Sequence, residues 1–430
     1  MNGESRRRNC VVLALSILLL PLASCGRTST LDRGEAQQSV QTEPQGAVPA
    51  TPQDARDGET LDVVGAQKST WGARDLTAHR VVFADRSSQG YLLLLPAPPD
   101  GSPPRAPTRA ALRSWVDEAF ADHSDLDEIR LLRRLIETDA EAPSAIAPLS
   151  TLKIDPNDPA SMRRQAKVSD LIGLHVAILE TSDVASASIL QDPILSRHLS
   201  AEDRMSLPRR SYALLLRADY RSREAFRGLR LLQTLVRIAS RKLNALILDP
   251  DTLEVRDQES FSRARLRSAT AAVASQVTVV PFRDGESEAK SVRLTTRGMR
   301  RFGTVDLELT GLPLEPAVLQ RATDLLYGLA LVLVKTAEVD RKGFALEVSD
   351  VVTVHWRDIE QAYEGSAREL PRCEACPETV EVHLVERPRL PSDPQDHVVA
   401  QMVAPRTTSD TASYNHGAWT KRALARMFGG

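Results

Sequence analysis

The sequence predicts an α+β fold, with two to three mixed sheet and helix units that follow a disordered N-terminal tether. Segments of strand and helix pattern are mixed without the strict alternation of a doubly wound sheet. Aromatic residues make up only 4% of the chain, so the core must be built mainly from Leu, Val, Ile and Ala. Residues 25–66 are rich in Gln, Thr, Pro, Ala and Gly and lack apolar periodicity, which is typical of a flexible tether.

Residues 1–24 have the three parts of a secretory signal peptide. Arginines at 6–8 are followed by an apolar run at 11–23, and small residues precede Cys25. The sequence Leu-Ala-Ser-Cys at 22–25 resembles the lipobox of bacterial lipoproteins. This resemblance implies lipidation of Cys25, with fatty acids such as palmitate, at the new N-terminus. The alternative is an uncleaved anchor helix, which Pro21 disfavours in a run already short for the ~20 residues of a membrane span.

The same resemblance implies a place in the cell envelope, with the chain lipid-anchored on the extracytoplasmic side. Gly26 follows the cysteine where Asp would favour retention, so we expect the outer membrane if the organism has one. A tether of about 40 residues has a root-mean-square reach of about 35 Å. A net charge of −2 argues against nucleic acid as a partner, which leaves the membrane and a possible envelope protein.

The first folded unit is expected at residues 67–150. Strands are predicted at 79–84 and 91–96, with a polar turn at 85–90 between them. Apolar residues at helical spacing predict a helix from Thr108 and a second one with Ser124 as its N-cap. The segment at 140–159 is rich in proline and small residues, and we take it as a domain boundary.

The central unit is expected at 165–337, and it has the clearest pattern. A long helix should span 225–243, and an unusually apolar one should run from Pro316 to about Lys335. Asp249-Pro250-Asp251 should form the turn of a hairpin. The strands predicted here lie at 174–180, 212–217, 245–248, 252–255, 277–282, 291–296 and 305–309.

The C-terminal segment at 340–430 is expected to be α+β as well. It includes a Cys-x-x-Cys loop and a basic amphipathic tail at 419–428, and residues 398–408 are ambiguous. Strands are predicted at 344–348, 351–356 and 379–385, with a short helix at 358–364.

Three stretches within the central unit carry a further resemblance. They are Tyr-Ala-Leu-Leu-Leu at 212–216, Ala-Leu-Ile-Leu-Asp-Pro at 245–250 and Thr-Thr-Arg-Gly-Met-Arg-Arg-Phe-Gly at 295–303. Through them, residues 171–334 resemble an uncharacterised bacterial family known only as a domain of unknown function. The resemblance implies α+β architecture and no particular chemistry.

Cys373 and Cys376 form the only classical motif of the mature chain. A redox-active pair needs its first thiol near a helix N-terminus, whereas this pair precedes Pro377 and a predicted strand. A zinc site would need further ligands, for which His355 and His383 are available. An extracytoplasmic address favours a possible disulfide between Cys373 and Cys376 over metal or redox chemistry.

Two basic surfaces allow alternative interpretations. The long helix carries arginines along one side, which could meet phospholipid head groups or an acidic partner but are more simply its solvated face. The C-terminal tail could lie on a membrane surface or dock on its own domain. The arginines of the long helix are Arg223, Arg227, Arg230, Arg237 and Arg241.

The sequence contains no P-loop, nucleophile elbow, metalloprotease helix, dinucleotide turn or calcium loop. Its catalytic residues are therefore unknown, and we expect neither a metal nor a cofactor. We expect a non-catalytic binding or interaction protein of the cell envelope. The alternative is an envelope enzyme, either a hydrolase or a thiol-redox protein.

Overall fold

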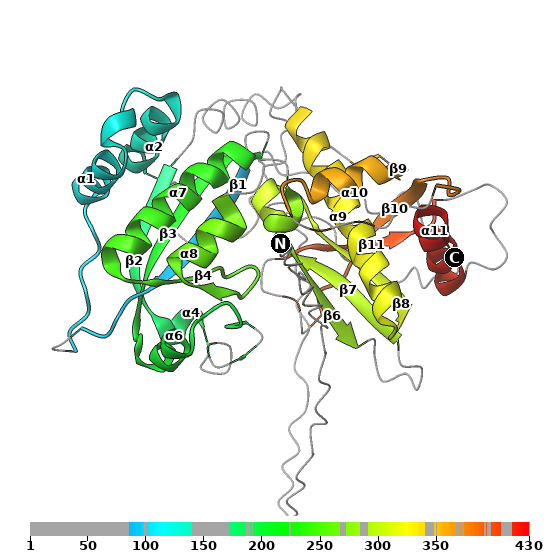
Figure 1. The fold of residues 1–430 in the computed structure, drawn as a ribbon, viewed down its shortest axis with the longest axis horizontal. Helices are drawn as coiled ribbons and strands as arrows, with labels where there is room; N and C mark the ends of the chain where they lie inside the picture. Colours follow the sequence, from blue (N-terminus) through cyan, green and yellow to red (C-terminus); the bar gives the residue numbers. More distant parts are fainter. Residues whose placement is uncertain are drawn as a thin grey trace, which may run out of the picture. The chain divides into compact units, whose positions relative to one another are not determined.

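The fold is α+β, with strands in two sheets flanked by helices (Figure 1). The computed structural model describes residues 86–98, 101–139, 173–185, 190, 192–193, 195–222, 225–266, 272–283, 291–339, 348–349, 351–366, 368, 370, 374–390, 393, 397–405 and 415–429. The predicted signal peptide, the predicted tether and the strands predicted at 79–84 and 344–348 lie outside these ranges, apart from Val348.

The first sheet has five strands in the order β2-β3-β1-β4-β5, and every neighbouring pair is antiparallel. Its hairpin from β4 to β5 turns at Asp249-Pro250-Asp251, as the sequence predicts. The strands are β1 (Arg86–Leu94), β2 (Gly173–Glu180), β3 (Tyr212–Arg221), β4 (Leu246–Leu248) and β5 (Val255–Arg256).

The polar turn predicted at 85–90 is wrong, because Arg86 to Gly90 belong to β1 and pair with β3 along their whole length. Cross-strand partners bind the buried hydroxyls of this segment. The Ser87 and Ser222 hydroxyls are 2.8 Å apart, and Ser88 donates to Asp219. Polar residues that look like a turn in the sequence therefore extend the strand.

The helices that accompany the first sheet include α1 (Arg109–Ala119), α2 (Asp127–Glu137) and α7 (Ala225–Leu243). Figure 1 shows α7 lying along the sheet, where it contacts β3 and β1. The helix expected from Thr108 is α1, and Thr108 is its N-cap: the Thr108 hydroxyl accepts a hydrogen bond from the Ala111 amide. The predicted N-cap at Ser124 is wrong: α2 begins at Asp127 after Leu126, and no side chain caps it.

The second sheet has six strands in the order β6-β7-β8-β11-β10-β9, and only β8 and β11 are parallel. The ambiguous segment at 398–408 contributes β11 from Val399 to Val403. The other strands are β6 (Thr278–Arg283), β7 (Ser291–Arg297), β8 (Asp306–Pro313), β9 (Val352–His355) and β10 (Thr379–Arg387).

Three helices pack on this sheet: α9 (Pro316–Val339), α10 (Trp356–Ala362) and α11 (His416–Phe428). By length and apolar composition α9 could cross a membrane, and it is the one such helix in the described part of the chain. Here it packs against β8, β9 and α10, with Leu325, Leu326 and Leu329 fully buried.

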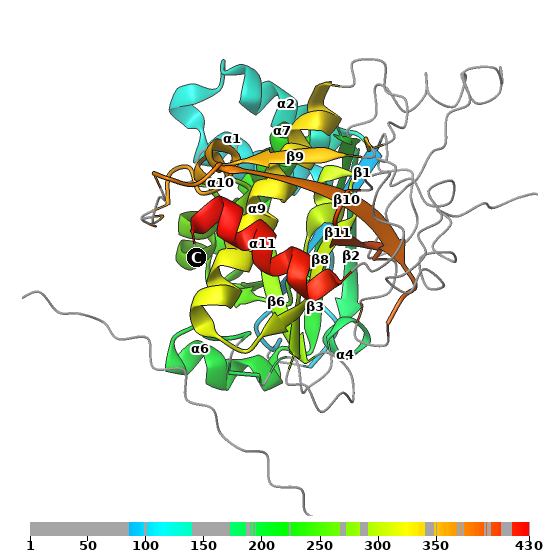
Figure 2. The same ribbon diagram turned by 90° about the vertical axis from the view of Figure 1, so that its right-hand side faces the viewer.

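The C-terminal helix α11 docks on its own fold. It contacts β8, β10 and α9, and Figure 2 shows it lying across these elements. Trp419, Leu424 and Met427 are buried in the contact. Of the two alternatives for the tail, docking accounts for its apolar side.

The sheets divide the chain differently from the predicted units. The first sheet joins β1, from the unit expected at 67–150, to β2 through β5 from the central unit, while the second sheet spans the expected boundary near residue 340. One apolar core also runs through both halves, with Leu93 and Leu232 in the same cluster as Leu309 and Leu329. Strand pairing between distant segments is not visible in local composition.

Candidate functional site

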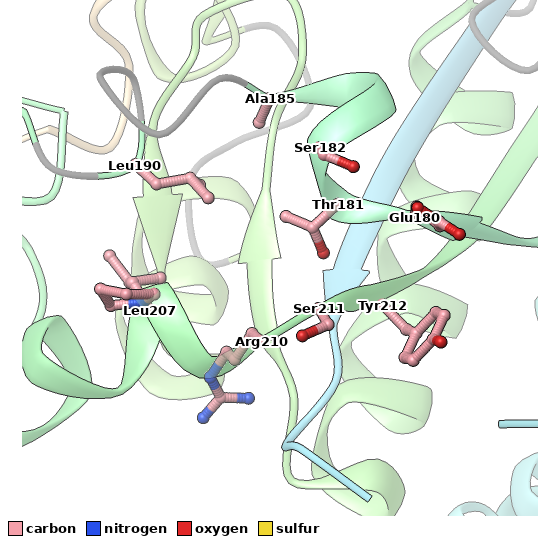
Figure 3. Close-up of a pocket in the computed structure, with 10 residues that line it drawn as sticks. Glu180, Thr181, Ser182, Ala185, Leu190, Leu207, Arg210, Ser211 and Tyr212 are labelled. Atoms are coloured by element: carbon pink, nitrogen blue, oxygen red, sulfur yellow. The ribbon is translucent and has the colours of Figure 1, made fainter. Parts of the chain in front are cut away.

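A pocket of about 340 Å³ opens where β2 ends and β3 begins (Figure 3). Two short helices, α4 (Thr181–Val184) and η2 (Leu207–Arg209), form its sides. The residues around it are Glu180, Thr181, Ser182, Ala185, Leu190, Leu207, Pro208, Arg210, Ser211 and Tyr212. This volume lies within the range of small-molecule sites.

The Thr181 side chain is the unusual polar group of this pocket. It is only 4% exposed, and its Oγ1 has no hydrogen-bond partner among the described residues. The backbone amide of Thr181 donates to the Ser211 carbonyl over 2.9 Å, which fixes the residue in place. A buried hydroxyl without a partner costs about 1–3 kcal/mol. A ligand atom that bonded this hydroxyl would recover that energy.

Apolar side chains form the other wall of the pocket. Ala185, Leu190 and Leu207 are buried and belong to a small apolar cluster on one face of the first sheet. The pocket therefore combines an apolar wall with the hydroxyls of Thr181, Ser182 and Ser211. Its lining residues include one carboxylate, that of Glu180, and no histidine or cysteine.

Arg210 supports the pocket wall. Its Nη1 donates to the Leu94 carbonyl over 2.7 Å and to the Asn244 carbonyl over 3.2 Å, and its Nε donates to Ser206 Oγ over 3.1 Å. Figure 3 shows the guanidinium turned away from the Thr181 hydroxyl. Burial lowers the pKa of Arg210, and Asp203 partly opposes that effect. We therefore assign Arg210 to the wall of the pocket.

A second candidate is a buried cluster of charges that links the two sheets. It joins the Asp249-Pro250-Asp251 turn of the first sheet to the short helix η6 (Met299–Phe302) that follows β7. The Arg300 Nε donates to Asp251 Oδ1 over 2.8 Å, and the Arg301 Nη2 donates to Asp249 Oδ1 over 3.0 Å. Two stretches that carry the family resemblance are thus in direct contact.

Other polar groups complete this linking cluster. His397 Nδ1 lies 2.6 Å from Asp306 Oδ2, and the Tyr220 hydroxyl donates to the Arg301 carbonyl over 2.8 Å. Burial alone would raise the pKa of Asp251, but the Arg300 and Arg301 guanidiniums outweigh it and hold that pKa below its ordinary value. Asp251 is therefore an ion-pair partner and is not suited to act as a general acid.

A related cluster lies within the second sheet. Arg387 donates to Glu308 from Nε over 2.9 Å and from Nη2 over 2.7 Å, and to Asp393 over 2.5 Å. Arg293 adds a bond to Glu308 of 3.0 Å. Burial raises the pKa of Glu308, but bonds and charge from Arg387 outweigh it and the net shift is downward. These buried carboxylates are paired and closed to solvent, which indicates a structural role.

No family model, curated protein or solved structure matches this chain. The resemblance of residues 171–334 to the uncharacterised family therefore stays a prediction. The site is argued from the geometry of the chain itself.

The candidate residues named from the sequence are not among those that line the pocket or form the linking cluster. Cys25 and Cys373 are outside the described ranges. Cys376 is disulfide-bonded, and its partner is not among the described residues, so pairing with Cys373 stays a prediction. His355 and His383 lie on β9 and β10, and within the described ranges no group of three or more His, Cys, Asp or Glu side chains could hold a metal.

Sequence reasoning missed both the pocket and the linking cluster. Thr181 and Ser211 belong to no motif, and only the antiparallel pairing of β2 with β3 brings them together. The linking cluster did leave a signal, since acidic and basic pairs stand at 249–251 and 300–301. The sequence does not show which carboxylate pairs with which arginine.

Proposed function

We propose that this chain is a lipid-anchored protein of the cell envelope that binds other molecules and does not transform them. The observation that carries the proposal is the sequence Leu-Ala-Ser-Cys at 22–25, placed after the arginines at 6–8 and an apolar run. A cysteine in that position accepts a lipid through its thiol. Several acyl chains together give stable anchoring, because each buried methylene contributes about 0.8 kcal/mol.

The proposed anchor is tested by labelling with radioactive palmitate. Cys25→Ala should abolish the label and leave an unprocessed precursor, because no other residue provides the thiol at the cleavage point. Cys10→Ala is the matched control, since Cys10 lies within the leader and should leave labelling unchanged. Intact-mass spectrometry showing an unacylated product of the natural sequence would refute the anchor.

The binding activity is assigned to the pocket around Thr181. Its size, its apolar wall and its unpaired hydroxyl suit a small molecule with an aliphatic part and one hydrogen-bonding group. The paired state of Asp251 and Glu308 supports binding over acid–base catalysis in the described part of the chain.

A thermal-shift screen of small aliphatic alcohols, acids and amides tests this assignment. A ligand of the pocket should raise the melting temperature of the natural chain, and Thr181→Val should weaken its binding. A broad hydrolase screen on the same protein should show no turnover. Turnover abolished by Thr181→Val would establish an enzyme and refute the proposal.

A further inference from the structure

Helix α7 carries a straight line of arginines. Arg227, Arg230, Arg237 and Arg241 follow one another at spacings of three, seven and four residues, with Thr234 between them. At 100° per residue these four positions fall within an arc of about 80°, and at 1.5 Å per residue they span about 21 Å. The side chains of Arg227, Arg230 and Arg241 are exposed, and that of Arg237 is half-buried.

The charge of α7 is of one sign. Between Ala225 and Leu243 the helix has four arginines and Lys242 but no Asp or Glu. Neighbouring α1 and α2 differ, because each carries equal numbers of acidic and basic residues. Burial, and after it the charge of Arg241, lowers the pKa of Arg237. Like charges at such spacing destabilise a helix, and a merely solvated surface does not require them.

We propose that this arginine line, residues 227, 230, 237 and 241, lies against the anionic phospholipid head groups of the bilayer that holds the chain. Guanidinium groups bind phosphate oxygens in a fork geometry and are weakly hydrated, so they suit this contact. Within the described residues, the Arg230 Nη2 donates to a neutral acceptor, the Leu266 carbonyl, over 3.0 Å. The choice of a bilayer as partner rests on the proposed lipid anchor, which keeps the folded part near a membrane.

Vesicle co-sedimentation tests the arginine line without the anchor. The full chain with Cys25→Ala is mixed with vesicles of phosphatidylglycerol and phosphatidylcholine, and separately with phosphatidylcholine alone. The natural arginines should give preferential binding to the anionic vesicles that is lost near 1 M salt, where the Debye length is about 3 Å. Each arginine near the surface contributes about fivefold, so Arg227→Gln with Arg230→Gln should weaken partitioning about 25-fold.

Two further pairs of substitutions keep the test decisive. Arg237→Gln with Arg241→Gln should weaken binding to a similar degree. Arg422→Gln with Arg426→Gln in α11 is the matched control, because these exposed residues lie on another basic helix that has no carboxylate. The control should bind as the parent does, and thermal unfolding should be alike for all variants.

Two results would overturn the proposal: equal binding by the parent and both α7 variants, or loss of binding confined to the α11 variant. The outcome is separate from that of palmitate labelling. A chain that fails to incorporate palmitate but binds anionic vesicles through α7 would refute the anchor alone. A labelled chain with no α7-dependent binding would refute the arginine line alone.

Discussion

At the scale of single residues, the pocket and the linking cluster differ in how their buried polar groups are paired. The Thr181 hydroxyl has no partner among the described residues. The buried Arg301 meets two carboxylates through its Nη2, while its Nε and Nη1 have no partner among the described residues. An unpaired group weakens a fold unless another role retains it, and a paired charge holds its neighbours in one arrangement. The first suits a ligand site and the second a structural joint.

Thr181→Val should stabilise the free protein by about 1 kcal/mol, because it replaces an unsatisfied hydroxyl with a methyl group of similar size. The same change should weaken any ligand that bonds the hydroxyl. Urea unfolding of the free chain measures the first effect. Ser182→Ala, at an exposed position of the same pocket, is the control and should stay within about 0.5 kcal/mol of the parent. A clear loss of stability in Thr181→Val would contradict the assignment of an unpaired hydroxyl.

Arg301→Met should destabilise the fold by about 3–5 kcal/mol, because it removes one of the cations that pair with carboxylates in a fully buried cluster. Arg301 is fully buried, with Asp249 and Asp251 as its partners. Arg263→Met is the matched control, since Arg263 pairs with Glu259 on the surface and should contribute at most about 1 kcal/mol. Similar urea midpoints for the two variants would show that the linking cluster adds little.

At the scale of elements, the sequence predicts most helices and strands well where one periodic pattern dominates. The apolar positions from Ala225 to Leu243 that predict a long helix all lie in α7, and the helix expected from Pro316 begins there. Prediction fails where contacts with a distant strand decide the local structure. Arg86 to Gly90 look like a turn until Ser88 meets Asp219 across the strand pair. Sheet membership is not local either, since β1 pairs with β3 more than a hundred residues later.

Gly228 fixes how closely α7 packs on β3. A Cβ at this position would lie 2.4 Å from Tyr220 Cγ, in a fully buried ring whose hydroxyl bonds to the Arg301 carbonyl. Gly228→Ala should therefore destabilise the protein by about 1–3 kcal/mol through overpacking, although alanine is normally the better helix former.

Gly417 in α11 is the matched control for Gly228. A Cβ there meets only Asn415 Oδ1 at 3.7 Å, an ordinary contact. Gly417→Ala should thus raise the free energy of unfolding by about 0.5–1 kcal/mol through helix propensity. Chemical denaturation of both variants gives the comparison. Equal effects of the same sign would mean that α7 and β3 are not in close contact at Tyr220.

At the scale of the whole folded region, ion pairs connect segments that the apolar core alone does not orient. Arg300 and Arg301 bind the 249–251 turn of the first sheet, while Arg387 ties β10 to Glu308 on β8. Apolar burial is non-directional, whereas these bidentate contacts fix direction and register. Buried ion pairs contribute little net stability, so their value here lies in specifying one arrangement of the two sheets.

This dependence on buried carboxylates predicts loss of stability in acid. Asp251, Glu254, Glu308 and Asp393 all have pKa values held below their ordinary 3.8 or 4.5. Contacts with arginine outweigh burial for Asp251, Glu308 and Asp393, and the hydrogen bond from His198, followed by contacts with Arg265 and Arg256, does so for Glu254. Asp324, whose pKa burial raises, is the exception and acts in the opposite sense.

Above these ordinary pKa values, the carboxylates are ionised in both the folded and the unfolded chain, and their contribution to stability is complete. Below them the unfolded chain takes up protons that the folded chain resists, so unfolding becomes easier as pH falls toward the folded values. Urea midpoints should therefore fall steadily below about pH 4.5. A midpoint at about pH 3.5 equal to that at pH 7 would mean that these carboxylates are not paired in the folded protein.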